Sequence, residues 1–283
     1  MPCERTLKMV KKAIAVDLDG TFLHSDQSFD EARFETFLNQ WLDQGHEFIL
    51  ATGREEKLID HLFANYLDCL NLVVNNGAVM RARFDSQSVA AYLSQTALGG
   101  LQAIIQKFHP TDSVLAFSDN HFYGIAGFGE RDSGSMALLE ASFGPIIWVD
   151  HLLDIEEAVT SVTANFGEQA SEQVGEYVNA TLGEIVHATT SGMGALDVLA
   201  KGVNKASGLE KLLTKLAIAP EDLTVFGDGM NDVEMMQLAG QVFVMPNGDA
   251  RLMDLGYQIA SFDNNADGVL YEAERILAQE INN

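Results

Sequence analysis

The chain has 283 residues, a length that fits two domains or one core with a large insertion. Hydrophobic residues make up 47% and charged residues 20%, which is typical of a folded globular protein and excludes global disorder. Seventeen basic against 41 acidic residues give a formal net charge of −24. An acidic surface of this kind repels phosphate backbones and anionic lipid headgroups. We therefore expect neither nucleic acid nor a membrane as a partner.

Targeting and redox signals are absent from the sequence pattern. Cys3 and Cys69 are the only cysteines, too few for a disulfide framework or a thiolate zinc site. The apolar run at residues 13–16 is too short for a signal-peptide core, and the long charge-free run at 86–106 is rich in Ser, Thr and Gln. We therefore expect a cytoplasmic protein, and nothing in the pattern implies a protein partner.

The first eighty residues alternate apolar strands with amphipathic helices. Residues 13–16 predict a short buried strand, and Ser28-Phe29-Asp30-Glu31 predicts a capping box at the start of a helix that ends near Gly45. One apolar stripe is expected on this helix, formed by Phe34, Phe37, Leu38, Trp41 and Leu42. Two further strands at 48–51 and 70–74 are separated by a helix, which indicates a parallel sheet with right-handed crossovers.

The pattern changes after this region and later returns. Between residues 83 and 187 we expect helices at 96–108 and 169–182 and strands near 114–117, 146–149 and 158–166. The alternation resumes with a helix at 204–216, a strand at 223–226, a helix at 231–239, a strand at 242–244 and a helix at 268–278. The expected fold is therefore α/β: a Rossmann-like parallel-sheet core, residues 1–82 and 188–283, with an inserted α+β cap, residues 83–187.

A polar cluster follows each core strand. These clusters are Asp17-Leu18-Asp19-Gly20-Thr21, Thr52-Gly53-Arg54, Asn75-Asn76-Gly77 and Gly227-Asp228-Gly229-Met230-Asn231-Asp232. In doubly wound sheets, ligands bind beyond the carboxyl ends of the strands, so the clusters are expected at one edge. Asp17, Asp19 and Asp228, with Asp232 nearby, would repel one another without a cation. Their oxygen ligands favour Mg²⁺, and the lack of His or Cys in the clusters argues against zinc or copper.

Such an edge can transfer a phosphoryl group. A carboxylate beside Mg²⁺ can attack phosphorus, and a second carboxylate two residues on can protonate the leaving oxygen and then activate water. Simpler interpretations exist for each cluster alone. Asp-Gly pairs are ordinary turns, Lys205 could be a solvated residue, Arg54 a surface charge, and Asn75 and Asn76 could only serve the turn at Gly77. Four clusters at one edge make turns alone the weaker explanation.

With these residues in view, the chain resembles the haloacid dehalogenase-like (HAD) phosphatases. Asp17 to Thr21 matches their DxDGT signature, Thr52 the second motif, Lys205 the third, and Gly227 to Asp232 (GDGMND) the fourth. The motifs stand in the family's order, and the resemblance covers nearly the whole chain. Asn75-Asn76-Gly77-Ala78 and the GVxK pattern ending at Lys205 resemble the Cof-type branch (subclass IIB), which carries a C2-type cap.

The resemblance implies a role for each matching position. Asp17 would be the nucleophile and a Mg²⁺ ligand, and Asp19 the general acid/base with its backbone carbonyl on the metal. Asp228 would complete the metal ligands, with Asp232 acting through water or by orienting Lys205. Phosphate would be held by Leu18 N–H, Thr52, Gly53, Lys205 and Asn231, with Arg54 and Asn76 in support. The chain departs from the pattern at Asp197, Ala200 and Pro246-Asn247-Gly248, the last of which lies near the site.

The function implied is that of a Mg²⁺-dependent phosphatase acting through an aspartyl-phosphate. Its substrate would be a small phosphorylated metabolite: a sugar phosphate, a nucleotide or a vitamin-derived phosphate. A phosphomutase with the same nucleophile is one alternative. A non-catalytic regulatory protein that binds phosphate and Mg²⁺ is another, but binding alone does not require the Asp17 and Asp19 pair.

Overall fold

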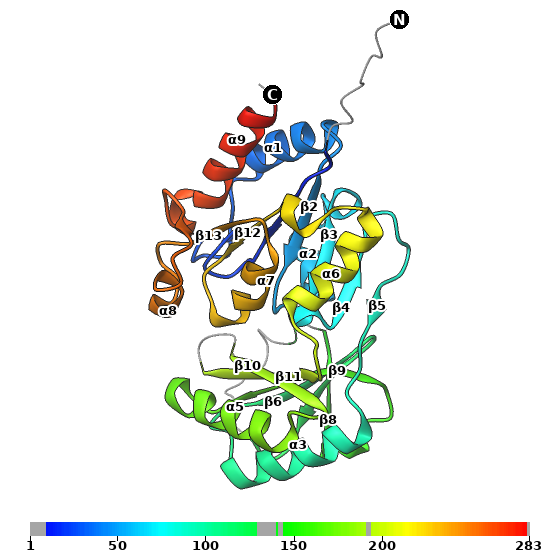
Figure 1. The fold of residues 1–283 in the computed structure, drawn as a ribbon. Coiled ribbons are helices and arrows are strands. Elements are labelled where there is room, and N and C mark those ends of the chain that lie inside the picture. The colour runs from blue at the N-terminus through cyan, green and yellow to red at the C-terminus, as the bar shows by residue number, and fades with distance from the viewer. Residues whose placement is uncertain (1–9, 129–139, 141–143, 191–193, 282–283) are drawn as a thin grey trace, which may run out of the picture.

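Two β-sheets organise the chain in the computed structural model, which describes residues 10–128, 140, 144–190 and 194–281 (Figure 1). The first sheet has the order β14 (Gln258–Ile259), β13 (Gln241–Val244), β12 (Leu223–Gly227), β1 (Ala13–Val16), β2 (Glu47–Ala51), β3 (Asn71–Val74), β4 (Val79–Arg81), β5 (Val89–Ala90). The second has the order β10 (Val186–Thr190), β11 (Ala195–Ala200), β9 (Val159–Asn165), β6 (Val114–Ser118), β7 (Phe122–Ile125), β8 (Ile146–Val149).

The first sheet is the centre of a three-layer α/β/α core. Strand β1 pairs in parallel with both β2 and β12, and its apolar residues are buried on both faces because helices cover each side. Helices α1 (Glu31–Asp43) and α9 (Gly268–Ile281) pack on one face. Helices α6 (Lys205–Leu216) and α7 (Val233–Leu238) pack on the other, while the short α2 (Glu56–Leu62) and α8 (Ala250–Met253) flank the sheet. The expected parallel-sheet fold is confirmed.

The second sheet is mostly antiparallel, and in the described part of the chain two helices cover one side of it. Its helices α3 (Gln95–Phe108) and α5 (Glu168–Leu182) lie on the side away from the first sheet, as Figure 1 shows. The other face of the sheet is turned toward the carboxyl ends of the first sheet's strands. Among the described residues, the lobes built on the two sheets meet where Arg251 lies 2.8 Å from Glu172 and where His187 Nε2 lies 3.9 Å from a Glu234 oxygen. The second sheet thus covers the edge where the polar clusters were expected.

The start of the first core helix differs from the expectation. Helix α1 begins at Asp30, whose side chain accepts from the Arg33 N–H, so the predicted capping box of Ser28 and Glu31 is wrong. Asp30 is the N-cap because its carboxylate lies next to the first turn, whereas the Ser28 hydroxyl donates to Asp26. Sheet membership changes after β5 and after β11, whereas the domain limits at 82/83 and 187/188 remain a prediction.

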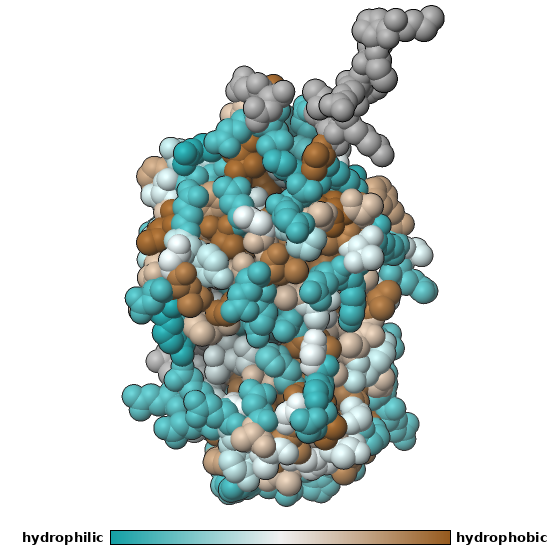
Figure 2. Space-filling view, in the orientation of Figure 1, coloured by the Kyte–Doolittle hydropathy of each residue, from teal (hydrophilic) through white to brown (hydrophobic). Residues whose placement is uncertain are grey.

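The surface agrees with the acidic, polar composition. Hydrophilic residues cover much of the face shown in Figure 2, and hydrophobic residues lie between them in small groups. Within the described part of the chain, no helix has the length and apolar character needed to cross a bilayer.

Candidate active site

The ends of β1 and β12 bring two acidic clusters side by side. Because the two strands are parallel neighbours, Asp17 and Asp228 leave the sheet at adjacent positions, and the Asp17 N–H donates to Phe226 O at 3.0 Å. Gly20 has a positive φ of 72°, and a side chain there would collide with the Asp228 carboxylate. Thr21 Oγ1 donates to Asp228 Oδ1 at 2.8 Å. Gly20 therefore leaves room for the Asp228 carboxylate, and Thr21 holds that carboxylate in place.

A buried lysine lies between two of the carboxylates. Lys205 opens helix α6, which Asn204 caps, and its Nζ lies 2.7 Å from Asp17 Oδ1 and 2.6 Å from Asp232 Oδ1. Its side chain is 0% exposed. Burial alone would lower the pKa of Lys205, but the attraction of Asp17 and Asp232 outweighs it and raises that pKa. The lysine therefore stays charged, and the simple interpretation of Lys205 as a solvated residue is wrong.

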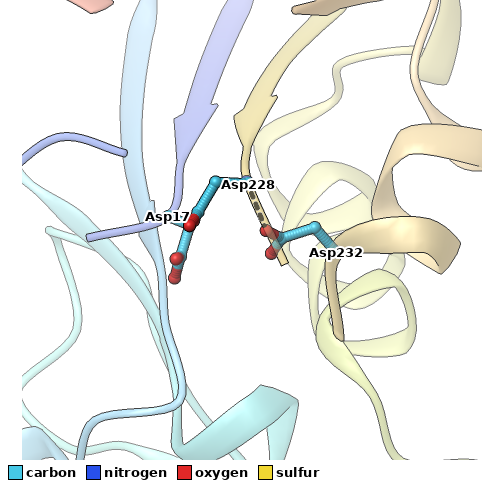
Figure 3. A group of neighbouring side chains, drawn as sticks. All are labelled: Asp17, Asp228 and Asp232. Atoms are coloured by element: carbon cyan, nitrogen blue, oxygen red, sulfur yellow. Dashed lines mark hydrogen bonds between the residues drawn. The ribbon is translucent and has the colours of Figure 1, made fainter. Parts of the chain in front are cut away.

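Asp232 holds this arrangement together with both of its oxygens. One oxygen binds Lys205, and the other accepts the N–H groups of Asp228 at 2.9 Å and Gly229 at 3.0 Å. Figure 3 shows the Asp17, Asp228 and Asp232 side chains gathered at the ends of β1 and β12 and the turn before α7. Of the two roles that the resemblance implied for Asp232, the contacts with Lys205 match the orienting one.

The same three carboxylates form a candidate metal centre. Oxygens of Asp17, Asp228 and Asp232 lie within 4.8 Å of one another. Burial raises the pKa of Asp17 well above its usual value, more than Lys205 can offset, while Asp228 and Asp232 raise it further. Burial and the charge of Asp232 also raise the pKa of Asp228 to about 6. A hard cation would compensate this unfavourable negative charge, so the donor set fits Mg²⁺.

Asp19 pairs with an arginine and is not one of these three carboxylates. Its two oxygens accept from Arg54 Nε at 2.6 Å and Arg54 Nη2 at 2.5 Å, and 54% of its side chain is exposed. Arg54 is fixed in turn by Gln27, and the Arg54 N–H donates to Thr52 Oγ1 at 3.1 Å. The two acids of the first cluster therefore lie in different environments, one buried and one accessible to a ligand and water.

The remaining predicted residues meet at Asn76. The Asn76 N–H donates to Thr52 O at 3.0 Å, and its side-chain Oδ1 accepts from Asn231 Nδ2 at 3.1 Å. Gly53 lies against the Asn76 carboxamide. Leu18 is different, because it is fully buried and its side chain packs in the hydrophobic core, so the phosphate contact of its N–H remains a prediction.

Three residues near the site were not assigned a role from the sequence. Thr21 binds Asp228, although its place in the first cluster was a usable signal. Asp197 binds Asn76, and the signal was an acid inside an otherwise apolar strand. Burial, followed by the charge of Asp197, raises the pKa of Glu55 to about 8, and no sequence signal marks this residue.

The unusual Pro246-Asn247-Gly248 segment also reaches the site. Asn247 Nδ2 donates to the backbone oxygen of Gly20 at 2.7 Å, and the Asp249 N–H that follows the segment donates to Asp228 O at 2.8 Å. The segment therefore supports the backbone of both acidic clusters.

Comparisons with known proteins show the family of the chain. A family model described as haloacid dehalogenase-like hydrolase matches residues 14–272. The curated 5-amino-6-(5-phospho-D-ribitylamino)uracil phosphatase YbjI of Escherichia coli (strain K12) is 27% identical over 272 residues, covering 95% of this chain and 97% of that protein. The solved structure of SMU.1108c from Streptococcus mutans UA159 has a TM-score of 0.86 at 26% identity, covering 95% of this chain and 99% of that one.

A more distant solved structure shares the fold. The HAD subclass IIB sugar phosphatase BT4131 has a TM-score of 0.78 at 18% identity, and the match covers 94% of this chain and 99% of that one. The family model spans both lobes and all four clusters. The chain therefore belongs to the haloacid dehalogenase-like hydrolases, as its ordered motifs predicted.

Proposed function

We propose that this hydrolase is a Mg²⁺-dependent phosphatase that cleaves a small phosphorylated metabolite through an aspartyl-phosphate. One observation carries the proposal: a buried carboxylate, Asp17, is held 2.7 Å from a buried lysine, while a second carboxylate, Asp19, lies two residues away and 54% exposed. A nucleophile needs a fixed position, and a proton donor needs access to the leaving group. The pair supplies both.

The chemistry then divides between the two acids. Asp17 attacks phosphorus, so that a bond from its carboxylate oxygen to phosphorus forms as the ester bond to the leaving oxygen breaks, and Asp19 gives its proton to that oxygen. Water next attacks the aspartyl-phosphate and gives a proton to Asp19, which releases phosphate and restores Asp17. Lys205, Thr52 and the N–H groups that follow Thr52 neutralise the phosphoryl oxygens.

Asp17, Asp228 and the Asp19 backbone carbonyl would hold Mg²⁺, with Asp232 close to the ion. The bound ion supplies positive charge that stabilises the transferring phosphoryl group. Arg54 holds the Asp19 carboxylate and therefore sets the direction in which the proton is delivered. We further propose that the insertion, residues 83–187, acts as a cap that selects the substrate, because the second sheet lies over the site.

The substrate class follows from these features and from the relatives. A site covered by the second sheet suits a small molecule, and the E. coli relative is named for a phosphate ester on a ribityl chain. We propose a small phosphorylated metabolite, with sugar phosphates, nucleotides and vitamin-derived phosphates as the panel to screen.

The test separates Asp17 from Asp19 by trapping the intermediate. With an aryl phosphate, whose leaving group needs little protonation, Asp19→Asn should become phosphorylated and then hydrolyse slowly, by about 10²–10⁴-fold. Intact-mass measurement after rapid mixing should show roughly 80 Da added to Asp19→Asn and none to Asp17→Asn. Phosphate trapped on Asp17→Asn would reverse the assigned roles. Release of an isomerised ester in place of inorganic phosphate would identify a phosphomutase.

A further inference from the structure

The turn after β3 adopts a strained backbone at the centre of the site. Asn75 and Asn76 both have left-handed φ values, 52° and 48°. Asparagine tolerates this region better than most residues, but two in succession cost free energy that the surroundings must supply. Two backbone bonds do so, because the Asn75 N–H donates to Arg54 O at 2.8 Å and the Asn76 N–H to Thr52 O at 3.0 Å. The turn is thereby tied to the loop that would hold phosphate.

The Asn76 side chain links the two sheets. It is 2% exposed, its Nδ2 donates to Asp197 Oδ2 at 2.8 Å, and its Oδ1 accepts from Asn231 Nδ2 at 3.1 Å. Asp197 lies on β11 of the second sheet, whereas Asn231 follows β12 of the first. A single buried amide therefore connects the second sheet to a residue expected to bind phosphate.

The oxygens of Asp197 determine how this amide is oriented, because one accepts from Asn76 Nδ2 and the other from Thr163 Oγ1. An ionised carboxylate only accepts hydrogen bonds, so the Asn76 atom that faces it must be the nitrogen. The Asn76 oxygen must then face Asn231, which in turn presents its own nitrogen. A neutral amide in place of Asp197 could donate or accept, and the orientation of both asparagines would no longer be determined.

The surroundings hold both ends of this chain of contacts firmly. Asp197 is paired with Thr163 in the β11–β9 ladder, and Thr163 Oγ1 donates to Asp197 Oδ1 at 2.6 Å. On the other side, a Cβ added to Gly53 would lie 3.2 Å from Asn76 Nδ2 and 3.3 Å from its Oδ1, so the carboxamide lies directly against the phosphate loop.

We propose that Asp197 is a positioning residue for phosphate binding, which acts by orienting Asn76 and, through Asn76, the carboxamide of Asn231. The inference rests on the proposed function, because it takes Asn231 as a phosphate ligand. It also assigns the second sheet a part in catalysis beyond substrate selection, since the contacts that orient Asn231 through Asn76 require β11 to be docked on the turn.

The first experiment compares Asp197→Asn with a matched control at the same interface. Ser161→Ala removes a buried hydrogen bond of 2.8 Å from Ser161 Oγ to Asn75 Oδ1, next to Asn76, but leaves the contacts of Asp197 in place. With Mg²⁺ and inorganic phosphate as the competitive inhibitor, Asp197→Asn should raise the inhibition constant about tenfold, the order of one charge-assisted hydrogen bond. Ser161→Ala should change it less than about twofold. Equal effects would show that phosphate binding depends on the general docking of the second sheet, and they would overturn the proposal.

The second experiment tests whether Asp197 acts through Asn231. In the Asn231→Ala background, Asp197→Asn should cause no further loss of phosphate affinity, because the group that it positions is gone. Independent, multiplying losses would contradict the proposal. If Asp197→Asn does not fold, Asn76→Gly, which suits the positive φ, breaks the same contacts and should weaken phosphate binding equally.

A spectroscopic readout keeps this inference separate from the proposed function. In ¹⁵N-labelled protein, the side-chain NH₂ signals of Asn76 and Asn231 should both shift in Asp197→Asn and stay in place in Ser161→Ala. An unmoved Asn231 signal would refute the orientation through Asn76, even in a protein that hydrolyses no phosphate ester. A wild-type protein without phosphatase activity but with the expected shifts would refute only the proposed function.

Discussion

Removing the charge of Lys205 should destabilise the folded protein strongly. Lys205→Met keeps the length of the side chain but leaves Asp17 and Asp232 without the ammonium group that lies 2.7 and 2.6 Å from their oxygens. Lys205 and Asp232 are fully buried and Asp17 nearly so, and breaking a buried ion pair on one side costs about 3–5 kcal/mol. We expect the free energy of unfolding at pH 7.5 to fall by about that amount in a metal-free buffer.

The measurement is urea unfolding followed by circular dichroism in EDTA, with Lys201→Met as the control. Lys201 Nζ lies 2.7 Å from a Glu184 oxygen, but the two side chains are 53% and 95% exposed. That exposed pair should contribute only about 0–1 kcal/mol. The loss in Lys205→Met should shrink at lower pH, because burial already raises the pKa of Asp17 and protonation removes its charge. A loss of less than about 1 kcal/mol, or one equal to the control, would refute the assignment of Lys205 as a buried counter-ion.

Three further predictions concern the metal and the acids around it. Phosphatase activity should vanish in EDTA and return when Mg²⁺ is added. Ca²⁺ should restore it poorly, because its looser coordination disturbs in-line attack. Full activity in chelator would exclude a metal. The pKa of Asp228 is raised from 3.8 to about 6, so its contribution to stability is present below pH 3.8 and lost as the pH rises through 6. Asp228→Asn in EDTA should therefore raise the melting temperature at pH 7.5, with a gain that disappears near pH 4 in scanning calorimetry; an equal gain at both pH values would contradict this origin. Arg54→Met should change the free energy of unfolding by less than about 1 kcal/mol, because Asp19 is exposed. It should nevertheless lower kcat/KM about tenfold. Unchanged kinetics would show that Arg54 is only a surface charge.

The fold and the edge of the sheet that carries the site could be predicted from local patterns. Buried runs such as 13–16 and 223–226 became β1 and β12 because a strand covered on both faces must be apolar throughout. Parallel pairing of those strands then places the clusters that follow them at the same edge. Strand β11 was missed because its pairing with β9 is what stabilises it, and that contact is not visible in its own sequence.

Which acid meets which base was decided only by the tertiary structure. The sequence by itself determined that the clusters carrying Asp17, Asp19, Asp228 and Asp232 lie at one edge of the sheet. The family resemblance left Asp232 either a role through water or the orientation of Lys205, and no local pattern predicts that Asp232 contacts Lys205 or that Asp19 contacts Arg54. Lys205 reaches Asp17 across 188 positions of the chain because the first turn of α6 packs against β3 and the turn that follows it, and there burial removes water as an alternative partner. Local periodicity specifies the elements, whereas pairing between charged groups depends on desolvation, which exists only after the sheets and helices have packed.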